Sequence, residues 1–513
     1  MFWTPDNIRA ACGGAWIVRP AQIELPRDRP ADLPLPDLHA PITGVSTDTR
    51  TLQKGQAFIA LRGENFDGHA FLADAVKAGA PIAVIDDAAA IPAGGFPAPG
   101  NACGIMKVAD TGKALLRIAA AYRESLKRTK VIAVCGSNGK TTTTRLIEHI
   151  LGSCGLRGTA SAKSFNNAVG VPLTILRAKE TDQFLVCEVG TNHPGEIKTL
   201  AEVVKPDVAV ITSIGREHLE GFGDLAGVAA EEATVLKHLK GGASSTGGWV
   251  IATDAPELAE ALRGVKNTVT FGRSAPATLR LTEAHHEIEN GQAWLAFTVN
   301  GRQKYRVPLV GEHNALNAMA ALAVARRLGV DEQRAAAALA TAGGAEMRLM
   351  IERVGGVGGA EGATIINDAY NANPDSMIAG IETLVSLGAA GFAGAKRCVC
   401  VLGEMLEMGA ASAPGHRAVA EAIVDRSKKH PIGLAVLVGE GMEEARDALQ
   451  GTGWGGDKVK WFATADGEGA GEIAGLLRGG DLVLVKGSRR VRLERVVGVV
   501  KARGAGEPVA PVG

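Results

Sequence analysis

The chain has 513 residues, and its 55 Lys and Arg residues are balanced by 55 Asp and Glu residues. This length exceeds one ordinary hydrophobic core and favours roughly two to four domains. The balanced charge argues against a general polyanion-binding surface, so any anion site must be local. No apolar run reaches the ~18 residues that span a bilayer, and the N-terminus lacks the basic segment, apolar core and cleavage pattern of a signal peptide. We therefore expect a cytoplasmic protein.

The first predicted domain, residues 1–128, is an α/β domain. It contains a Pro-rich stretch at residues 26–41, and residues 44–86 then follow a strand, helix and strand pattern with Gly turns. Residues 109–127, with the sequence ADTGKALLRIAAAYRESLK, carry apolar residues at three- and four-residue spacing, which predicts a helix that closes the domain.

The second predicted domain, residues 129–344, begins with the strand KVIAVCG, a Gly-rich turn and the helix TTTTRLIEHILGSCG. Further strands are predicted at FLVCEVG and VAVITSIG, with helical segments between them. Strands that alternate with helices indicate a parallel sheet with crossover helices. Their continuous apolar character fits a sheet that is buried on both faces.

The third predicted domain, residues 345–513, repeats this style with the strands CVCVLGE, LAVLVGE and DLVLVKGS. The pattern indicates a second, smaller open α/β domain. The chain has seven cysteines but no CxxC pair, and Cys398 and Cys400 stand two apart in an apolar run, so they would share one strand face. We favour reduced core cysteines over a metal or redox site.

The strongest chemical signal is VIAVCGSNGKTTTT, in which a predicted strand, a glycine turn and a predicted helix follow one another. Backbone N–H groups at a helix N-terminus point at a polyphosphate, and glycines allow close approach. Lys140 would neutralise the β- and γ-phosphates, and the Thr141 hydroxyl would bind magnesium. Val134 replaces the first Gly of the common GxxxxGK[ST] pattern. The alternative is an ordinary glycine turn with an exposed lysine.

Two further strands end in groups suited to a metal ion. Glu188 closes the strand in FLVCEVG, and His218 follows the strand in VAVITSIG. Ligands of open parallel sheets lie at the carboxyl ends of the strands. Magnesium prefers oxygen ligands, so the residues alone favour Glu188 over His218.

Several motifs together resemble one family. GSNGKTTT, SFNNAVGVPLTIL, EVGTNHPGEI, SIGREHLEGFG, GEHNALNAMAA, INDAYNANPDSM, VLGEMLEMG and VLVKGSRR are similar to the Mur ligases, and in particular to those that add D-alanyl-D-alanine to a UDP-N-acetylmuramoyl tripeptide. The segment DAYNANPDSM is the most discriminating. The resemblance implies three α/β domains: an N-terminal domain for the UDP substrate, a central P-loop domain with a parallel sheet for ATP, and a C-terminal Rossmann-like domain that closes the site.

The resemblance also implies a reaction. ATP and Mg²⁺ would convert the tripeptide carboxylate into an acyl phosphate, which the amine of D-alanyl-D-alanine then attacks. The products would be UDP-N-acetylmuramoyl pentapeptide, ADP and phosphate, as in peptidoglycan precursor synthesis. The family resemblance suggests a monomer that uses no nucleic acid and has no membrane span.

The nucleotide and metal residues are carried over from the matching motifs. The triphosphate would be held by Gly136, Ser137, Asn138, Gly139, Lys140, Thr141 and Thr142. The magnesium would be surrounded by Thr141, Glu188 and His218, and we expect the catalytic groups to be Lys140, Glu188 and His218. The rest of the nucleotide would meet His313 and Asn317 at the adenine, Asp368 at the ribose and Arg348 at the phosphates after closure.

The substrate residues are carried over in the same way. The uridine-side motif comprises Ser46, Asp48, Thr49 and Arg50, and Asn166 and Asn167 of the segment SFNN would contact substrate or phosphate. The incoming dipeptide would lie near Lys486, Ser488 and Arg489. The loop that contains Asp368 would also be lined by Tyr370, Asn371 and Asn373, which we count among the substrate-binding residues. As alternatives, Asn371 and Asn373 could simply shape a turn, and Lys486 and Arg489 could form a solvated basic rim.

The chain departs from the family pattern at three places. Many of these ligases have a carbamylated lysine that holds a second magnesium ion, and here that place falls on Glu232. Our hypothesis is that Glu232 supplies a built-in carboxylate; the alternative is a solvated glutamate on an amphipathic helix. Ser164 replaces a frequent Asn, and Met347 precedes Arg348 where a Gly is usual.

Two other functions remain open from the sequence. A neighbouring ligase could add another amino acid to a muramoyl peptide, or glutamates to folate. A P-loop switch or motor would instead hydrolyse ATP without a second substrate.

Overall fold

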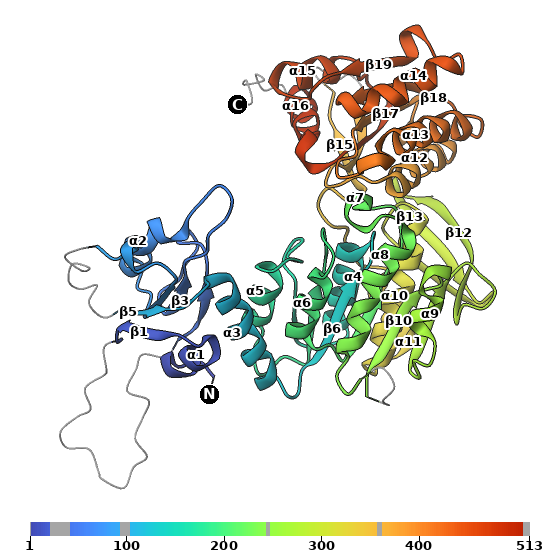
Figure 1. The fold of residues 1–513 in the computed structure, drawn as a ribbon. Coiled ribbons are helices and arrows are strands. Elements are labelled where there is room, and N and C mark those ends of the chain that lie inside the picture. Colours follow the sequence, from blue (N-terminus) through green and yellow to red (C-terminus); the bar gives the residue numbers. More distant parts are fainter. Residues whose placement is uncertain (1, 21–41, 93–102, 243–246, 357–361, 506–513) are drawn as a thin grey trace, which may run out of the picture. The chain divides into compact units, whose positions relative to one another are not determined.

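The computed structural model describes residues 2–20, 42–92, 103–242, 247–356 and 362–505. The Pro-rich stretch at 26–41 therefore lies outside the described residues. The described strands form three sheets, and some of these strands are labelled in Figure 1. The chain groups into two compact units: the first comprises Met1–Ala133, Arg157–Thr191 and Glu196–Asp207, and the second comprises Val134–Leu156, Asn192–Gly195 and Val208–Gly513.

The N-terminal sheet has five strands in the order β1-β5-β4-β3-β2, and only β1 runs antiparallel to its neighbour. Its strands are β1 (Ala15–Val18), β2 (Gly44–Ser46), β3 (Gln56–Ile59), β4 (Ile82–Ile85) and β5 (Gly104–Lys107). The helices of this region are α1 (Pro5–Cys12), α2 (Leu72–Lys77) and α3 (Thr111–Ser125). Phe58, Leu72 and Ile85 belong to one buried cluster, which joins the sheet to α2. The predicted strand, helix and strand are thus present.

The middle sheet has nine strands in the order β14-β13-β12-β11-β10-β9-β6-β8-β7. They are β6 (Lys130–Cys135), β7 (Gly158–Ala160), β8 (Phe184–Glu188), β9 (Val208–Ile211), β10 (Trp249–Thr253), β11 (Thr268–Gly272), β12 (Leu279–Glu289), β13 (Gln292–Val299) and β14 (Gln303–Val307). The pairs β7–β8, β9–β10, β10–β11 and β11–β12 are parallel, as the alternation of strands and helices predicted.

The helices between these strands follow the chain order that a crossover topology requires. They are α4 (Lys140–Ser153), α5 (Gly170–Arg177), α6 (Glu196–Val204), α7 (Leu219–Phe222), α8 (Leu225–Glu232) and α9 (Ala259–Leu262). Two more helices, α10 (His313–Arg327) and α11 (Glu332–Leu339), follow β14. No helix in the described part of the chain combines the length and the apolarity that crossing a membrane demands.

One part of the middle sheet was not predicted. Strands β12, β13 and β14 pair antiparallel and extend the sheet at one edge. Their two tight connections are residues 290–291 and 300–302. Each contains an Asn-Gly pair, Asn290–Gly291 and Asn300–Gly301, and all four of these residues have positive φ, between 51° and 74°. Asn-Gly with positive φ at both positions is the signature of a type I′ hairpin turn, so the sequence held a signal for this extension.

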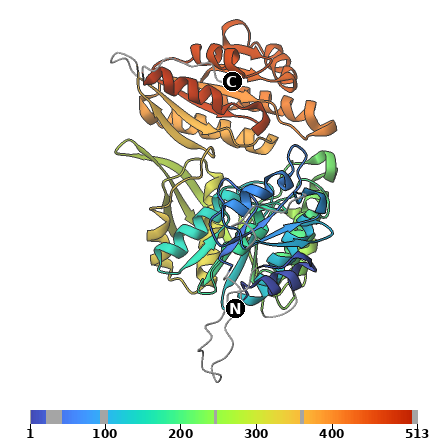
Figure 2. The ribbon, with the colours of Figure 1, turned by 90° about the vertical axis from the view of Figure 1, so that its left-hand side faces the viewer.

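The C-terminal sheet has six strands in the order β15-β16-β20-β17-β18-β19, and only β15 is antiparallel to its neighbour. The strands are β15 (Met350–Val354), β16 (Ala363–Asp368), β17 (Arg397–Gly403), β18 (Ile432–Val438), β19 (Val459–Phe462) and β20 (Asp481–Lys486). Side chains of α12 (Pro374–Ala389), α13 (Ser412–Ser427) and α14 (Glu443–Gly451) form one core on this sheet. Side chains of α15 (Gly467–Gly475) and α16 (Glu494–Gly504) form the core on its other face (Figure 2).

Three α/β domains with mostly parallel sheets confirm the predicted fold class. We keep residues 1–128, 129–344 and 345–513 as the proposed domain bounds.

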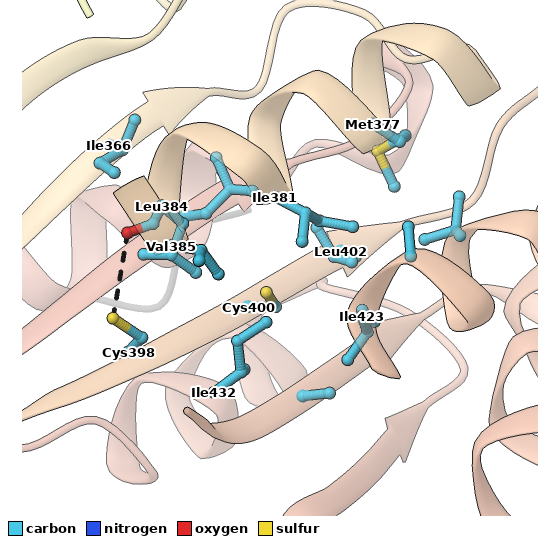
Figure 3. Close-up of a cluster of buried hydrophobic side chains, with 14 of the residues drawn as sticks. Ile366, Met377, Ile381, Leu384, Val385, Cys398, Cys400, Leu402, Ile423 and Ile432 are labelled. Carbon is cyan, nitrogen blue, oxygen red and sulfur yellow. Dashed lines mark hydrogen bonds between the residues drawn. The ribbon is translucent and has the colours of Figure 1, made fainter. Parts of the chain in front are cut away.

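The two cysteines of β17 lie on the same face of the strand. Cys398 and Cys400 both point into the core beneath α12, beside Ile381 and Leu384 (Figure 3). All seven cysteines of the chain are free and buried. Burial raises the pKa of the Cys187 thiol to about 12, and because the thiolate is the reactive form, such thiols are inert.

We therefore predict that the folded protein does not react with an aromatic disulfide reagent. All seven thiols should become reactive once the chain is unfolded in guanidinium, because only unfolding exposes them. Spectrophotometric thiol titration before and after denaturation measures both numbers. Rapid reaction of a thiol in the native protein would contradict the burial of these side chains.

Candidate active site

The loop between β6 and α4 has two backbone positions that only glycine fills well. Gly136 has φ +112° and Gly139 has φ +85°. A Cβ atom at Gly136 would lie 2.5 Å from the Thr212 Oγ1 atom, and one at Gly139 would lie 2.2 Å from the Asn317 Oδ1 atom. Both the left-handed backbone and the close neighbours therefore exclude a side chain at these positions.

The segment that follows β9 holds this loop in place. The Ser137 N–H donates to the Ser213 carbonyl (2.9 Å), and the Asn138 N–H donates to the Ser213 hydroxyl (2.8 Å). In return, the Gly215 N–H donates to Ser137 Oγ (2.8 Å), and the Thr212 hydroxyl donates to the Asn138 carbonyl (2.7 Å). Residues 212–215, which we call the bracing segment, thus fix the loop conformation.

Helix α4 begins directly after the loop, with Gly139 as its N-cap and without a side-chain cap. The positive end of the helix is therefore not neutralised by a capping side chain. The Lys140 ammonium folds back over the loop and donates to the carbonyls of Gly136 (2.5 Å) and Ser137 (3.1 Å). Thr141 follows in the first turn and is buried. Helix amides and an ammonium group at one end of a strand form an anion site.

Two buried carboxyl groups lie close to this loop. Glu232 is fully buried at the end of α8, and its Oε2 atom accepts a hydrogen bond from the Gly136 N–H (2.8 Å). Its Oε1 atom is also buried and has no hydrogen-bond partner among the described residues. The structure therefore does not show the solvated glutamate that was the alternative for this position.

Glu217 is the second buried carboxyl group, and the sequence analysis missed it. Its Oε1 atom lies 3.9 Å from the Lys140 ammonium. Burial raises the pKa of Glu217 to about 8, against the opposing attraction of Lys140. Burial likewise raises the pKa of Glu232. The sequence signal that could have identified Glu217 was its position directly before His218 in the segment REHLEG.

In the first compact unit, Glu188 ends β8 and is fully buried. The Asn166 amide donates to its Oε1 atom (3.2 Å), so two predicted site residues lie together. The Asn167 side-chain oxygen accepts hydrogen bonds from the N–H groups of Val169 (3.1 Å) and Gly170 (2.9 Å). It therefore fixes the start of α5.

His218 has an unusual backbone conformation for a non-glycine residue, with φ +48°, at the start of α7. Its Nδ1 atom lies 2.9 Å from the Glu407 Oε2 atom. A carboxylate on one ring nitrogen orients the imidazole for a role at the other nitrogen. Left-handed residues of this kind are found disproportionately at functional sites.

A recess of about 200 Å³ lies beside the start of α10. Its lining residues are Arg273, His286, Glu312, His313, Leu316, Ala379, Glu382, Thr383 and Ser386. His286 accepts a hydrogen bond from the Gly311 N–H at Nε2 (2.9 Å) and meets the Ser386 hydroxyl at Nδ1 (2.9 Å). Burial lowers the pKa of His286 to about 4, so the ring is neutral at physiological pH.

Asn317 is buried behind the loop instead of lining this recess. Its side-chain oxygen accepts from the Thr143 hydroxyl (3.3 Å), and its amide donates to Asn314 Oδ1 (2.8 Å). These bonds join α4 to α10, while His313 at the start of α10 lines the recess.

Residues at the carboxyl ends of β16 and β20 form a second polar group. The Lys486 ammonium donates to Asp368 Oδ2 (2.7 Å) and to the Asn371 carbonyl (2.9 Å). Lys486 is only 3% exposed, so the interpretation of it as a solvated rim is wrong. The Arg348 guanidinium stacks 4.4 Å above the Tyr370 ring. Predicted nucleotide and dipeptide residues thus meet here.

Two further residues of the VKGSRR motif contact other parts of the protein. The Ser488 hydroxyl accepts from the Leu406 N–H (3.0 Å) and is buried. Arg489 is half-exposed and pairs with Glu494 (3.3 Å).

The uridine-side motif forms a turn of its own after β2. Ser46 Oγ accepts from the Asp48 N–H (3.2 Å), and the Arg50 guanidinium forks onto the Asp48 carboxylate at 2.9 and 2.6 Å. Thr49 is half-buried between them. Hydrogen bonds from Arg50 lower the pKa of Asp48. Because the Arg50 side chain is 87% exposed, its charge is open to solvent.

The fold and the loop together define an α/β protein built to bind a nucleotide polyphosphate. Comparisons with known proteins agree. The Mur ligase middle domain matches residues 134–325, the Mur ligase glutamate ligase domain matches residues 351–489, and the catalytic domain of the Mur ligase family matches residues 41–123.

Individual relatives cover almost the whole chain. The UDP-N-acetylmuramoyl-tripeptide–D-alanyl-D-alanine ligase of Bacillus subtilis is 33% identical over 462 residues, which are 89% of this chain and 92% of the relative. The ligase of the same name from Escherichia coli is 32% identical over 78% of this chain and 84% of the relative. A crystal structure of MurF from Acinetobacter baumannii aligns with a TM-score of 0.75 at 28% identity, covering 97% of this chain and 98% of that one.

The chain therefore belongs to the Mur ligase family, in the branch of the UDP-N-acetylmuramoyl-tripeptide–D-alanyl-D-alanine ligases. The resemblance that the sequence motifs indicated is confirmed.

We predict that Gly139→Ala weakens ATP binding at least about tenfold. A left-handed Ala costs roughly 1–2 kcal/mol, and its Cβ would also press on Asn317. Gly152→Ala is the matched control, because Gly152 lies within α4 and has open space around it. Calorimetric titration with ATP measures both variants, and equal affinity for them would contradict the proposed role of the loop.

Proposed function

We propose that this chain joins D-alanyl-D-alanine to UDP-N-acetylmuramoyl tripeptide at the expense of ATP. The products are UDP-N-acetylmuramoyl pentapeptide, ADP and phosphate, in peptidoglycan precursor synthesis. The observation that carries the proposal is the braced phosphate loop, in a chain that matches the Bacillus subtilis ligase over 89% of its length.

The reaction needs an activated carboxyl group. A carboxylate oxygen of the tripeptide attacks the γ-phosphorus of ATP, the bond to the β-phosphate oxygen breaks, and ADP leaves. The neutral amine of D-alanyl-D-alanine then attacks the acyl carbon, loses a proton and expels phosphate. The loop amides and the Lys140 ammonium stabilise the charge of the phosphoryl group during transfer. Both substrates must be held in line and away from water, so positioning supplies much of the rate.

We propose that the magnesium ligands come from Thr141, Glu188, His218 and Glu232. Three of these residues offer oxygen atoms, and His218 offers a ring nitrogen. Carboxylate and hydroxyl oxygens are of the type that magnesium prefers, and the buried Oε1 atom of Glu232, without a hydrogen-bond partner in the described part of the chain, fits a cation. When bound, the ion would offset the negative charge of the phosphates.

We propose that the adenine enters the recess beside His313. The recess is close to α10, whose N-terminal residues were predicted to meet the base. The neutral His286 ring is a further polar group there, and Asp368 and Arg348 would serve the ribose and phosphates. Asn317 supports this site from behind by joining α10 to α4.

The substrate side remains as the motifs predicted. Ser46, Asp48, Thr49 and Arg50 would meet the uridine end, and Asn166 and Asn167 would contact substrate or phosphate. The dipeptide would lie near Lys486, Ser488 and Arg489, and Tyr370, Asn371 and Asn373 would line the loop that contains Asp368. We further propose a cytoplasmic monomer that acts on these small substrates and uses no nucleic acid.

Phosphate release from ATP tests the proposal directly. We expect release to require both UDP-N-acetylmuramoyl tripeptide and D-alanyl-D-alanine, with pentapeptide formed in equal amount by mass spectrometry. Other amino acids and other muramoyl peptides serve as comparison substrates. Release without the dipeptide would favour a P-loop switch, and turnover with another amino acid would favour a neighbouring ligase.

We predict that Lys140→Ala lowers kcat by about 100-fold or more, because a preorganised charge at the transferring phosphoryl group is lost. Lys130→Ala is the control, because Lys130 begins β6, the strand that leads into the loop, but its side chain is 62% exposed. Steady-state kinetics measure both. Parent-like turnover by Lys140→Ala would refute the role of the loop in catalysis.

We predict that Glu232→Gln depresses turnover about tenfold and raises the magnesium requirement. The Gln oxygen can still accept from the Gly136 N–H, so the substitution removes mainly the charge. Glu232→Lys should be weakly active and should gain activity with added bicarbonate, because a carbamylated lysine restores a carboxylate. Magnesium titrations of both variants measure the effect. Bicarbonate dependence of the parent, or unchanged kinetics of Glu232→Gln, would contradict the hypothesis.

A further inference from the structure

Polar contacts join the start of α12 to the surroundings of the phosphate loop. The Asp375 carboxylate accepts three hydrogen bonds from Arg216: from its backbone N–H (2.8 Å), from Nε (3.0 Å) and from Nη2 (2.6 Å). Next to this pair, the Asn373 amide donates to Asn138 Oδ1 in the loop itself (3.0 Å). We call these four residues the latch.

The C-terminal half of the latch is fixed by the local structure of α12. Asn373 is the N-cap, Pro374 occupies the first turn, and Ser376 completes a capping box. The Asn373 oxygen accepts from the Ser376 N–H (2.8 Å), so its amide nitrogen remains to reach Asn138. A capping box holds the first turn in one conformation, and Asp375 lies in that turn.

The other half is fixed by the bracing segment. Arg216 follows Gly215 directly, and Gly215 donates to Ser137 in the loop. A Cβ atom at Gly215 would lie 3.1 Å from the Asp375 Oδ2 atom, which shows how closely α12 approaches this backbone. The residue that contacts Asp375 is therefore directly bonded to the segment that holds the phosphate loop.

We propose that Arg216 and Asp375 seat the C-terminal domain on the phosphate loop, so that Arg216 is a positioning residue for ligation. This inference rests on the proposed function. The C-terminal domain carries Asp368, proposed to meet the ribose, and its hydrogen-bond partner Lys486, proposed to lie near the dipeptide. Both must come close to the nucleotide bound at the loop. The latch fixes where the domain stops.

The strength of the pair suits such a role. The side chains of Arg216 and Asp375 are 37% and 40% exposed, and an ion pair so exposed contributes little to global stability. The forked contact between the Arg216 guanidinium and the Asp375 carboxylate, together with the Arg216 backbone N–H, nevertheless defines the orientation of α12 relative to the bracing segment. A weak but well-oriented contact can form and break in each catalytic cycle.

The test separates seating from nucleotide binding. We expect Arg216→Ala and Asp375→Ala each to lower kcat about tenfold while KM for ATP changes less than about twofold, because the loop remains intact. The double variant should be no slower than either single variant, since both remove the same contact. Arg145→Ala is the matched control: Arg145 is 34% exposed and pairs with Glu148 (2.8 Å) inside α4. It should behave like the parent.

Parent-like kcat of Arg216→Ala, additive losses in the double variant, or an equal loss of ATP affinity would each overturn the latch. Small-angle X-ray scattering of the parent and Arg216→Ala, with and without a non-hydrolysable ATP analogue, gives a readout independent of ligation. We expect a smaller compaction in the variant, and equal compaction would also overturn the inference. If the parent protein does not ligate the two substrates, the proposed function is refuted. The scattering comparison still tests the latch in that case, because it does not depend on ligation.

Discussion

The conformation of the four-residue turn between β6 and α4 is the constraint on which the rest of the site depends. A chain can direct successive amides at a phosphate group only if its backbone adopts positive φ, which Gly136 and Gly139 do here. Such a turn is not stable alone, and hydrogen bonds from the bracing segment hold it. The anion site is therefore a property of two adjacent strand ends, β6 and β9.

Burial of acidic groups beside this turn has an energetic cost that function explains better than stability. Ionising a buried carboxyl group costs several kcal/mol unless it is paired, and burial accordingly raises the pKa of both Glu217 and Glu232. Glu232 offsets part of that cost through the Gly136 N–H, and Glu217 offsets part through Lys140. Proteins retain such incompletely compensated buried acidic groups mainly at active sites. A cation brought with the nucleotide would offset the remaining cost.

The sequence predicted those features that depend on nearby residues. Continuous apolar runs identified β6, β8, β9 and β17, because a buried strand needs no distant partner to be recognised. The antiparallel β12–β14 extension escaped prediction, although Asn-Gly pairs marked its turns. The contact of Arg216 with Asp375 joins residues 159 positions apart, and no local pattern predicts which distant side chains will meet. Lys486 illustrates the same limit, since a basic motif at a strand end gave no sign that its ammonium would be buried against Asp368.

Residues 212–218 combine these roles in one short stretch. Thr212, Ser213 and Gly215 hold the loop through backbone and hydroxyl groups, whereas Arg216, Glu217 and His218 direct their side chains to Asp375, Lys140 and Glu407. Three successive residues therefore serve three proposed purposes. Arg216 would position the C-terminal domain, Glu217 lies beside the Lys140 ammonium, and His218 is a proposed metal ligand oriented by Glu407. Because one backbone carries all three contacts, the proposed seating of the C-terminal domain through Arg216 would act directly on the segment that holds the phosphate loop. In the proposed mechanism, domain closure would therefore be coupled to the chemistry by chain connectivity alone.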